Sequence, residues 1–143
     1  MRVLGLDIGE RRIGVALSDP EGIIAIPLTV IERKSEDTAL KQLIDLTQEH
    51  EVERIVIGLP RSLDGSLGKQ AQAVQTFAES LAGCTELPVV TWDERLSTVA
   101  AERMMIEAGV KREKRKERLD SVAAAFILQG YLDRERSDIP GRD

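Results

Sequence analysis

The sequence predicts a mixed α/β fold in which three strands precede the first helix and two later strands alternate with helices. Five short apolar runs have the length and composition of strands: Arg2–Gly9, Ile13–Ser18, Ile23–Ile31, Arg54–Leu59 and Pro88–Trp92. Consecutive strands form an antiparallel meander, whereas strands separated by helices favour parallel pairing. We therefore expect a five-stranded mixed sheet, a three-strand meander plus two parallel strands, flanked by about four helices.

The first strand carries an acid, Asp7, near the end of an otherwise apolar run. An unpaired buried charge is costly, so such an acid is normally paired, hydrogen-bonded or bound to a metal. Gly9 follows it and allows backbone or a ligand to approach closely. The alternative is that Asp7 only caps the following turn, because Asp and Gly are both common in turns.

The next two strands complete the meander. Arg11 and Arg12 fall in the short turn before the second strand, and Gly22 introduces the third. Pro27 interrupts the third strand. Because proline cannot donate to a strand ladder, it predicts an edge position or a bulge.

Two helices are expected around the fourth strand. Ser35 is a suitable N-cap for a helix over about residues 36–50, and its apolar face consists of Leu40, Leu43, Ile44 and Thr47. After a loop over Arg61–Gly68, a second helix stops at Gly83. The apolar stripe of this second helix consists of Leu67, Ala71, Val74, Ala78 and Leu81.

Two more helices follow the last strand. Ser97 or Thr98 can cap a third helix that ends at Gly109. A fourth helix would place Asp120 in its first turn, with an apolar face formed by Leu119, Val122, Ala123, Phe126, Ile127 and Gly130. We expect one domain over residues 1–136 and a flexible tail over residues 137–143.

Composition limits the class of protein. The 143 residues are 42% hydrophobic and 31% charged, as in soluble globular domains. No apolar run approaches the ~20 residues needed to span a bilayer, and no signal-peptide pattern is present. A single cysteine, Cys84, cannot form an internal disulfide, and a single histidine, His50, excludes a His-rich zinc site. We expect a cytoplasmic protein without a membrane partner, either a monomer or a weak homodimer.

The net charge of −5 argues against a protein that coats nucleic acid without specificity. The segment Lys111–Arg118, however, contains six basic and two acidic residues. Such a run is usually a solvated loop. Its position just before Asp120 makes contact with a polyanion the competing interpretation.

Three acids attached to apolar elements are the candidate catalytic residues: Asp7, Glu94 and Asp120. Strand alternation places Glu94 on the face of Trp92 and turns Asp93 away. Each acid also has a structural explanation. At a helix N-terminus an acid gains ~0.3–1 kcal/mol from the dipole. Glu94 could instead pair with a neighbouring arginine, and Asp93 could cap a turn.

The joint interpretation of the acids is chemical. If the first, fourth and fifth strands are parallel neighbours, their carboxyl ends lie at one edge of the sheet. Carboxylates gathered there repel one another unless cations lie between them, and such oxygen ligands suit Mg²⁺ or Mn²⁺. A pair of these ions can stabilise both oxygens of a phosphoryl displacement.

The residues also resemble a known family. The YqgF (RuvX-like) family is similar to this chain from about Arg2 to Leu132. Its motifs correspond to Leu6–Gly9, Arg12–Ala16, Gly58–Pro60, Asp93–Thr98 and Asp120–Ala124. Among these, the string Asp-Glu-Arg-Leu-Ser-Thr is specific.

The resemblance implies a ribonuclease H-like fold related to Holliday-junction resolvases. It also implies a cytoplasmic, metal-dependent nuclease that matures the 5′ end of pre-16S ribosomal RNA, with the ribosome as a further partner. Carried over by position, Asp7, Glu94 and Asp120 are the metal-binding acids. Basic residues in nearby loops are expected to bind the substrate: Arg11, Arg12, Arg61, Lys69, Arg95, Arg112, Lys114, Arg115 and Lys116.

Three alternatives remain. The first is a Holliday-junction-type DNA resolvase. The second is an ATPase of the actin and sugar-kinase type, which needs two such domains to hold a nucleotide. The third is a non-catalytic module that binds RNA or the ribosome. With 3% aromatic residues, such a module would rely on phosphate contacts and shape rather than on base stacking.

Overall fold

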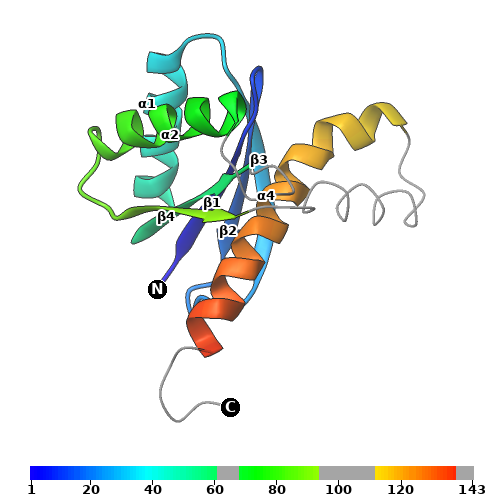
Figure 1. The fold of residues 1–143 in the computed structure, drawn as a ribbon. Helices are drawn as coiled ribbons and strands as arrows, with labels where there is room; N and C mark the ends of the chain where they lie inside the picture. Colours follow the sequence, from blue (N-terminus) through cyan, green and yellow to red (C-terminus); the bar gives the residue numbers. More distant parts are fainter. Residues whose placement is uncertain (61–67, 94–111, 138–143) are drawn as a thin grey trace.

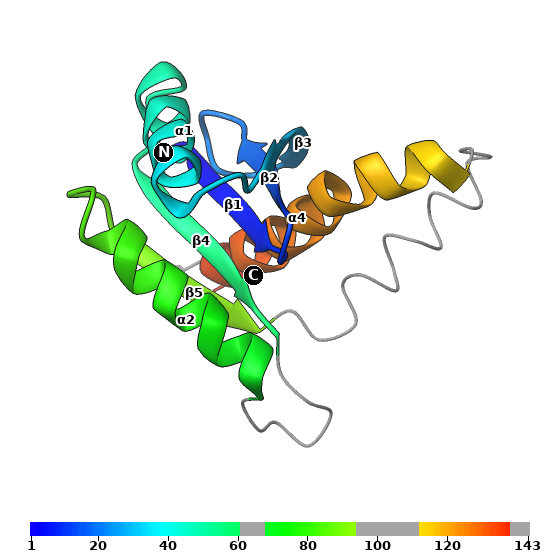
Figure 2. The same cartoon turned by 90° about the horizontal axis from the view of Figure 1, so that it is seen from above.

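The computed structural model describes residues 1–60, 68–93 and 112–137, with the backbone alone for residues 112–119 and 137. The elements in chain order are β1 (Val3–Ile8), β2 (Arg12–Ser18), β3 (Ala25–Glu32), α1 (Glu36–Glu49), β4 (Arg54–Leu59), α2 (Lys69–Ala82), β5 (Val89–Asp93) and α4 (Arg112–Ser137). The strands form one sheet of order β3-β2-β1-β4-β5. Helices α1 and α2 cover one face of the sheet and α4 crosses the other (Figures 1 and 2).

Strand pairing confirms the predicted mixed sheet. β1 pairs antiparallel with β2, and β2 with β3, while β4 runs parallel to both β1 and β5. β3 is an edge strand, and the pairing shifts within it. Val15 faces Thr29, whereas the next residue, Ala16, faces Pro27. Leu28 is therefore an extra residue, so the edge position and the bulge predicted from Pro27 are both present.

The two faces of the sheet bury different side chains. Leu4 and Leu6 of β1 lie in the larger apolar cluster beneath α1 and α2. Val3, in the same strand, lies in a second cluster beneath α4. This alternation follows from the two-residue period of a strand. It assigns each β1 side chain to one of the two helical layers.

The structure confirms the two helices that were predicted on either side of the fourth strand, α1 and α2. The Ser35 side chain accepts a hydrogen bond from the Thr38 amide, so Ser35 caps α1 as expected. α2 begins at Lys69 with Gly68 as its N-cap, and it ends at Gly83. Lys69, which the sequence placed in a loop, is therefore the first residue of a helix. Leu67 lies outside the described residues.

Helix α4 begins earlier than the sequence predicted. It starts at Arg112, so the basic residues 112–118 are helical and do not form a solvated loop. Lysine, arginine and glutamate are strong helix formers, and no glycine or proline interrupts them. Asp120 lies about two turns into the helix rather than in its first turn. The dipole explanation for this acid is therefore removed, because that effect fades within one turn.

The buried face of α4 also differs from the prediction. Val122 and Phe126 are only half-buried. Ala123 and Ile127 are buried as predicted, but the other buried side chains are Ala124, Leu128, Tyr131 and Leu132. Small residues lie toward the sheet because the helix backbone approaches glycines in the strands below. A pattern of large apolar residues does not reveal this close approach of the helix backbone.

Some expectations concern residues outside the described ranges. They are the third helix, from Ser97 or Thr98 to Gly109, most of the loop Arg61–Gly68, and the tail after residue 137. Within the described ranges, no helix combines the length and the apolar character needed to cross a bilayer.

Candidate functional site

The side chain of Asp7 belongs to the face of the sheet that α4 covers. Val3 and Gly5 share its parity along β1; Val3 packs in the cluster beneath α4, and a Cβ built on Gly5 would contact Leu128 of that helix. Asp7 is half-buried near the carboxyl end of the strand. Strand alternation therefore directs this acid toward α4 and away from the larger core.

Gly14 brings α4 onto the sheet beside Asp7. Asp7 and Gly14 are partners across the β1–β2 ladder, so their Cβ directions point to the same face. A Cβ on Gly14 would lie 1.8 Å from the backbone oxygen of Asp120. The helix backbone thus rests directly on β2, at a position that admits only hydrogen. This contact places Asp120 next to Asp7 although the two are far apart in sequence.

Asp120 forms an ion pair with Arg12, the first residue of β2. The Nε of Arg12 lies 3.0 Å from Oδ2 of Asp120, and the two side chains are 40% and 24% exposed. Oδ2 is itself buried and has no well-aligned hydrogen-bond donor among the described residues. The pair is therefore in charge contact at poor hydrogen-bond geometry, and Oδ2 keeps acceptor capacity toward the described residues.

Burial sets the electrostatics of Asp120. Loss of hydration raises the pKa of its carboxyl group above the ordinary value of 3.8, and the nearby Arg12 charge only partly offsets this rise. The ionised form is thus held in surroundings that disfavour it. A carboxylate in such surroundings gains free energy from any additional cation nearby.

The turn after Asp7 is fixed by Arg33, which sequence reasoning missed. The Gly9 amide donates to the Arg12 carbonyl at 2.9 Å and closes the turn. The Arg33 guanidinium donates to the Gly9 carbonyl at 2.7 Å and lies 5.1 Å above the ring of Phe77. The available signal was position: a basic residue directly after β3 must lie beside the β1–β2 turn, because β3 is antiparallel to β2.

The end of β5 is anchored to α4. Trp92 packs edge-on against Tyr131, with ring centroids 5.9 Å apart at 89°, and the Tyr131 hydroxyl accepts a hydrogen bond from Arg54 at the start of β4. Val90 and Trp92 pack against the cluster beneath α4, as the predicted alternation requires. Asp93 is exposed.

The parallel strands end at one edge of the sheet. Asp93 is level with Leu59 at the end of β4, and Leu6 is level with Ile57. The carboxyl ends of β1, β4 and β5 therefore share the edge where Asp7 lies. Glu94 is the residue after β5 and lies outside the described residues. Its convergence with the other two acids stays a prediction.

The carboxylate oxygens among the described residues suit a divalent cation such as Mg²⁺ or Mn²⁺. Asp7 and Asp120 offer carboxylate oxygens on one face, and Oδ2 of Asp120 is a buried acceptor without an aligned donor. Hard oxygen donors of this type suit these ions. Within the described ranges, no three of the side chains His, Cys, Asp and Glu gather closely enough to hold a metal. The predicted third ligand, Glu94, lies outside the described residues.

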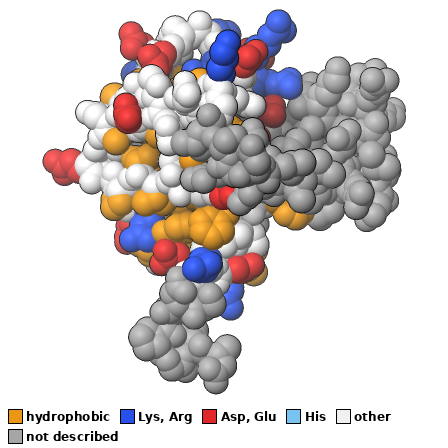
Figure 3. All heavy atoms as spheres, in the orientation of Figure 1, with side chains coloured by type: hydrophobic (Ala, Val, Ile, Leu, Met, Phe, Trp, Pro, Cys, Tyr) orange, Lys and Arg blue, Asp and Glu red, His pale blue; other side chains and the backbone are white. Residues whose placement is uncertain are grey.

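The predicted substrate-binding residues have different positions. Arg11 is exposed in the β1–β2 turn, Arg12 is paired with Asp120, and Lys69 is exposed at the start of α2. Lys and Arg side chains, mixed with acidic ones, gather at the top of Figure 3, over the end of the molecule where that turn lies in Figure 1. Arg112, Lys114, Arg115 and Lys116 belong to the first turns of α4. Arg61 and Arg95 lie outside the described residues.

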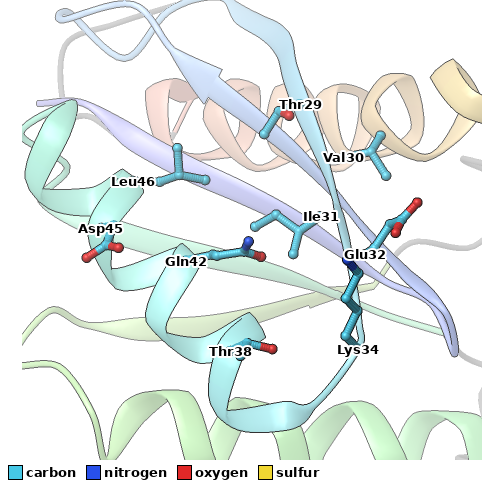
Figure 4. Close-up of a pocket in the computed structure, with 9 residues that line it drawn as sticks. All are labelled: Thr29, Val30, Ile31, Glu32, Lys34, Thr38, Gln42, Asp45 and Leu46. Carbon is cyan, nitrogen blue, oxygen red and sulfur yellow. The ribbon is translucent and has the colours of Figure 1, made fainter.

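A surface groove of about 580 Å³ lies apart from these acids, between β3 and α1. In Figure 4 its lining residues come from the edge strand on one side and from the helix on the other. Neither Asp7 nor Asp120 lines it. Because α1 and α4 cover opposite faces of the sheet, this groove is not part of the acidic site.

The raised pKa of Asp120 predicts that Asp120→Asn stabilises the protein at neutral pH. The folded state binds a proton at this site more readily than the unfolded chain does, so the ionised carboxylate lowers the free energy of unfolding above its folded pKa. The gain in melting temperature should be largest near pH 7 in EDTA. It should shrink as the pH falls through the raised pKa toward 3.8. A variant that is less stable than wild type at pH 7 would show that the Arg12 pair outweighs the cost of burial.

Comparison with protein families gives a match over almost the whole chain. The family model described as "RuvX: Holliday junction resolvase" matches residues 1–134. A protein of Desulforamulus reducens is 50% identical over 133 residues, which cover 93% of this chain and 97% of the relative. One from Moorella thermoacetica is 52% identical over 134 residues, which cover 94% and 96% of the two chains. Both carry the name "Putative pre-16S rRNA nuclease".

Solved structures match more distantly. T. thermophilus RuvC in complex with a Holliday junction substrate has a TM-score of 0.62 at 15% identity, covering 96% of this chain and 97% of that one. A fowlpox virus resolvase bound to Holliday junction DNA has a TM-score of 0.55 at 11% identity, covering 94% and 99%. At these identities the likeness shows the fold alone. It is the ribonuclease H-like fold that the sequence resemblance implied.

Proposed function

Because this chain belongs to the RuvX family, we propose that it is a metal-dependent nuclease that hydrolyses phosphodiester bonds in a precursor of ribosomal RNA. The observation that carries the proposal is the half-buried carboxylate of Asp120, whose Oδ2 has no aligned donor among the described residues. The helix backbone at Asp120 packs beside Asp7, at the edge where the parallel strands end. A buried acid with a raised pKa next to a second acid is a frequent feature of catalytic sites.

In this proposal Asp7, Glu94 and Asp120 would hold Mg²⁺ or Mn²⁺. When bound, such ions polarise the phosphate and stabilise the attacking and leaving oxygens. The chain's own residues supply the geometry. Gly14 fixes the position of α4, Arg33 fixes the turn after Asp7, and the contact of Trp92 with α4 fixes the strand that leads to Glu94.

The proposed substrate is the 5′ end of pre-16S ribosomal RNA, with action in the cytoplasm and close to the ribosome. The support is the name that the curated relatives carry at about 50% identity over more than nine-tenths of both chains. We propose that the protein acts as a monomer or a weak homodimer. The second candidate is cleavage of four-way DNA junctions, which the description of the matching family model favours.

One experiment separates these functions. Wild type and Asp7→Asn are incubated with precursor ribosomal RNA, single-stranded RNA and four-way DNA junctions, each in Mg²⁺, in Mn²⁺ and in EDTA. The proposal expects cleavage of the precursor by wild type alone and only with metal. Preferential cleavage of junctions would favour the resolvase. Tight RNA binding without turnover under every condition would favour the non-catalytic module and contradict the proposal.

The first turns of α4 are proposed to bind substrate. Figures 1 and 2 show this part of the helix, in yellow, extending beyond β3 and away from the sheet. It carries Arg112, Lys114, Arg115 and Lys116, and it leads directly to Asp120. A basic helix of this kind offers phosphate contacts next to the acids and would offset the overall charge of −5.

Replacing these four basic residues of α4 with alanine should weaken RNA binding. Each lost phosphate contact should reduce the log–log salt slope by ~0.7 for single strands, while the single-turnover rate at saturating RNA changes little. Binding is measured by fluorescence anisotropy over a series of salt concentrations. A matched comparison sets Arg115→Ala/Lys116→Ala against Arg2→Ala/Lys41→Ala, which removes two charges distant from the acids. Equal effects of the two double variants would indicate general charge rather than a binding surface.

A further inference from the structure

The pairing of Arg12 with Asp120 implies a role for Arg12 beyond general substrate attraction. An arginine that only attracts the substrate needs no carboxylate partner. Arg12, however, lies 3.0 Å from a buried oxygen of Asp120, a predicted metal ligand. The same oxygen cannot serve a guanidinium and a divalent cation equally well, because the two positive charges would lie close together and repel. Occupation of the acids by metal must therefore change the surroundings of Arg12.

We propose that Arg12 neutralises Asp120 in the metal-free protein and exchanges this partner for a phosphate of the nucleic acid when Asp120 takes up a divalent cation. This inference rests on the proposed function and assigns Arg12 two successive partners. In the free protein Arg12 offsets the charge of the Asp120 carboxylate. In the complex it binds substrate next to the reacting phosphate.

Several features of the structure favour such an exchange. The Arg12 side chain is 40% exposed, so its guanidinium can turn toward solvent without opening the core. Its backbone is held in place, because the Arg12 carbonyl accepts from Gly9 and its Cα pairs with Glu32 across the ladder. The contact with Asp120 is close but poorly aligned as a hydrogen bond, so less is lost when it breaks. Arginine also binds phosphate well through its planar set of donors.

The test measures metal binding in the absence of nucleic acid. Mn²⁺ affinity is determined calorimetrically for wild type, Arg12→Gln, Arg12→Lys and the control Lys41→Gln, which removes one charge from an exposed position on α1. Removing the competing charge should tighten Mn²⁺ binding to Arg12→Gln by about tenfold, which corresponds to about 1.4 kcal/mol less repulsion. Arg12→Lys, which keeps the charge, should stay near wild type, as should Lys41→Gln.

The second measurement is single-turnover cleavage over a range of RNA concentrations. Arg12→Gln should need about tenfold more RNA for its half-maximal rate, because one charge-assisted phosphate contact is lost. Arg12→Lys should lie between it and wild type. Tighter metal binding combined with weaker RNA binding in one variant is the signature of the exchange.

The direction in which Mn²⁺ affinity changes in Arg12→Gln distinguishes between the possible roles of Arg12. If Arg12 only anchors Asp120, its loss should loosen the carboxylate and weaken Mn²⁺ binding, and that result would overturn the proposal. Unchanged Mn²⁺ affinity in Arg12→Gln would overturn it as well. A wild-type protein that binds no Mn²⁺ would instead refute the proposed metal site itself, so the two failures are distinguishable.

Discussion

Asp7→Asn is expected to reduce metal-dependent cleavage by at least ~1,000-fold, an effect of about 4 kcal/mol on the barrier. The amide keeps the shape of the side chain but removes the charge that would hold the cation. The strand should be undisturbed, because Asp7 points toward α4 near the end of β1 and not into the larger core. Without metal, the variant should be as stable as wild type or slightly more so, since one of two neighbouring negative charges is gone.

The melting temperature in Mg²⁺ gives a readout independent of cleavage. A cation that binds only the folded state raises the melting temperature of wild type in proportion to its affinity, and the shift should be much smaller for Asp7→Asn. Asp45→Asn is the matched control, because this exposed acid pairs with Lys41 on α1, which covers the other face of the sheet. It should keep both activity and the Mg²⁺ shift. Equal shifts in wild type and Asp7→Asn would count against a metal site at this acid.

Gly14→Ala is expected to destabilise the protein by about 2–4 kcal/mol and to abolish cleavage. The new Cβ would lie 1.8 Å from the Asp120 backbone oxygen, far inside contact distance. Neither atom can rotate away, because both belong to rigid elements, so α4 must lift from the sheet. Asp120 would move with it, and misplacement of a catalytic group by about 1 Å can cost on the order of 100-fold in rate.

Chemical denaturation and circular dichroism separate the two effects of Gly14→Ala. Folded protein with reduced stability and no activity is the expected outcome at low temperature. Gly83→Ala is the control, because its nearest contact would be an ordinary 3.5 Å and its backbone φ of −71° suits alanine. That variant should be neutral or more stable. Wild-type activity and stability in Gly14→Ala would contradict the close contact between α4 and β2.

Local patterns in the sequence were sufficient to predict most of the sheet. The apolar runs identified all five strands, and Pro27 correctly indicated both an edge and a bulge. The parallel arrangement of β1, β4 and β5, which the sequence analysis took as a condition, is confirmed. These features are encoded locally, because strand period, turn residues and connection length act within a few residues of one another.

Other features depend on contacts between distant segments. The start of α4 was misjudged because a charged run was taken for a loop, although helix propensity favoured its continuation. The buried face of α4 was only partly predicted, since Ala123 and Ile127 are buried as expected. The close approach of the helix backbone to Gly5 and Gly14 was missed, because no stripe of apolar residues records it. The role of Arg33 was missed because its partners, Gly9 and Phe77, lie on different elements.

By itself, the sequence determined that Asp7 lies near the end of a buried strand, because a continuous apolar run is a local property. It also supplied the family resemblance, which the comparisons confirm. Only the tertiary structure decided that Asp120 lies beside Asp7 and is paired with Arg12. That arrangement depends on the absence of a side chain at Gly14, which lets a helix from the other end of the chain rest on the strand. No periodicity within either segment records a contact made between them.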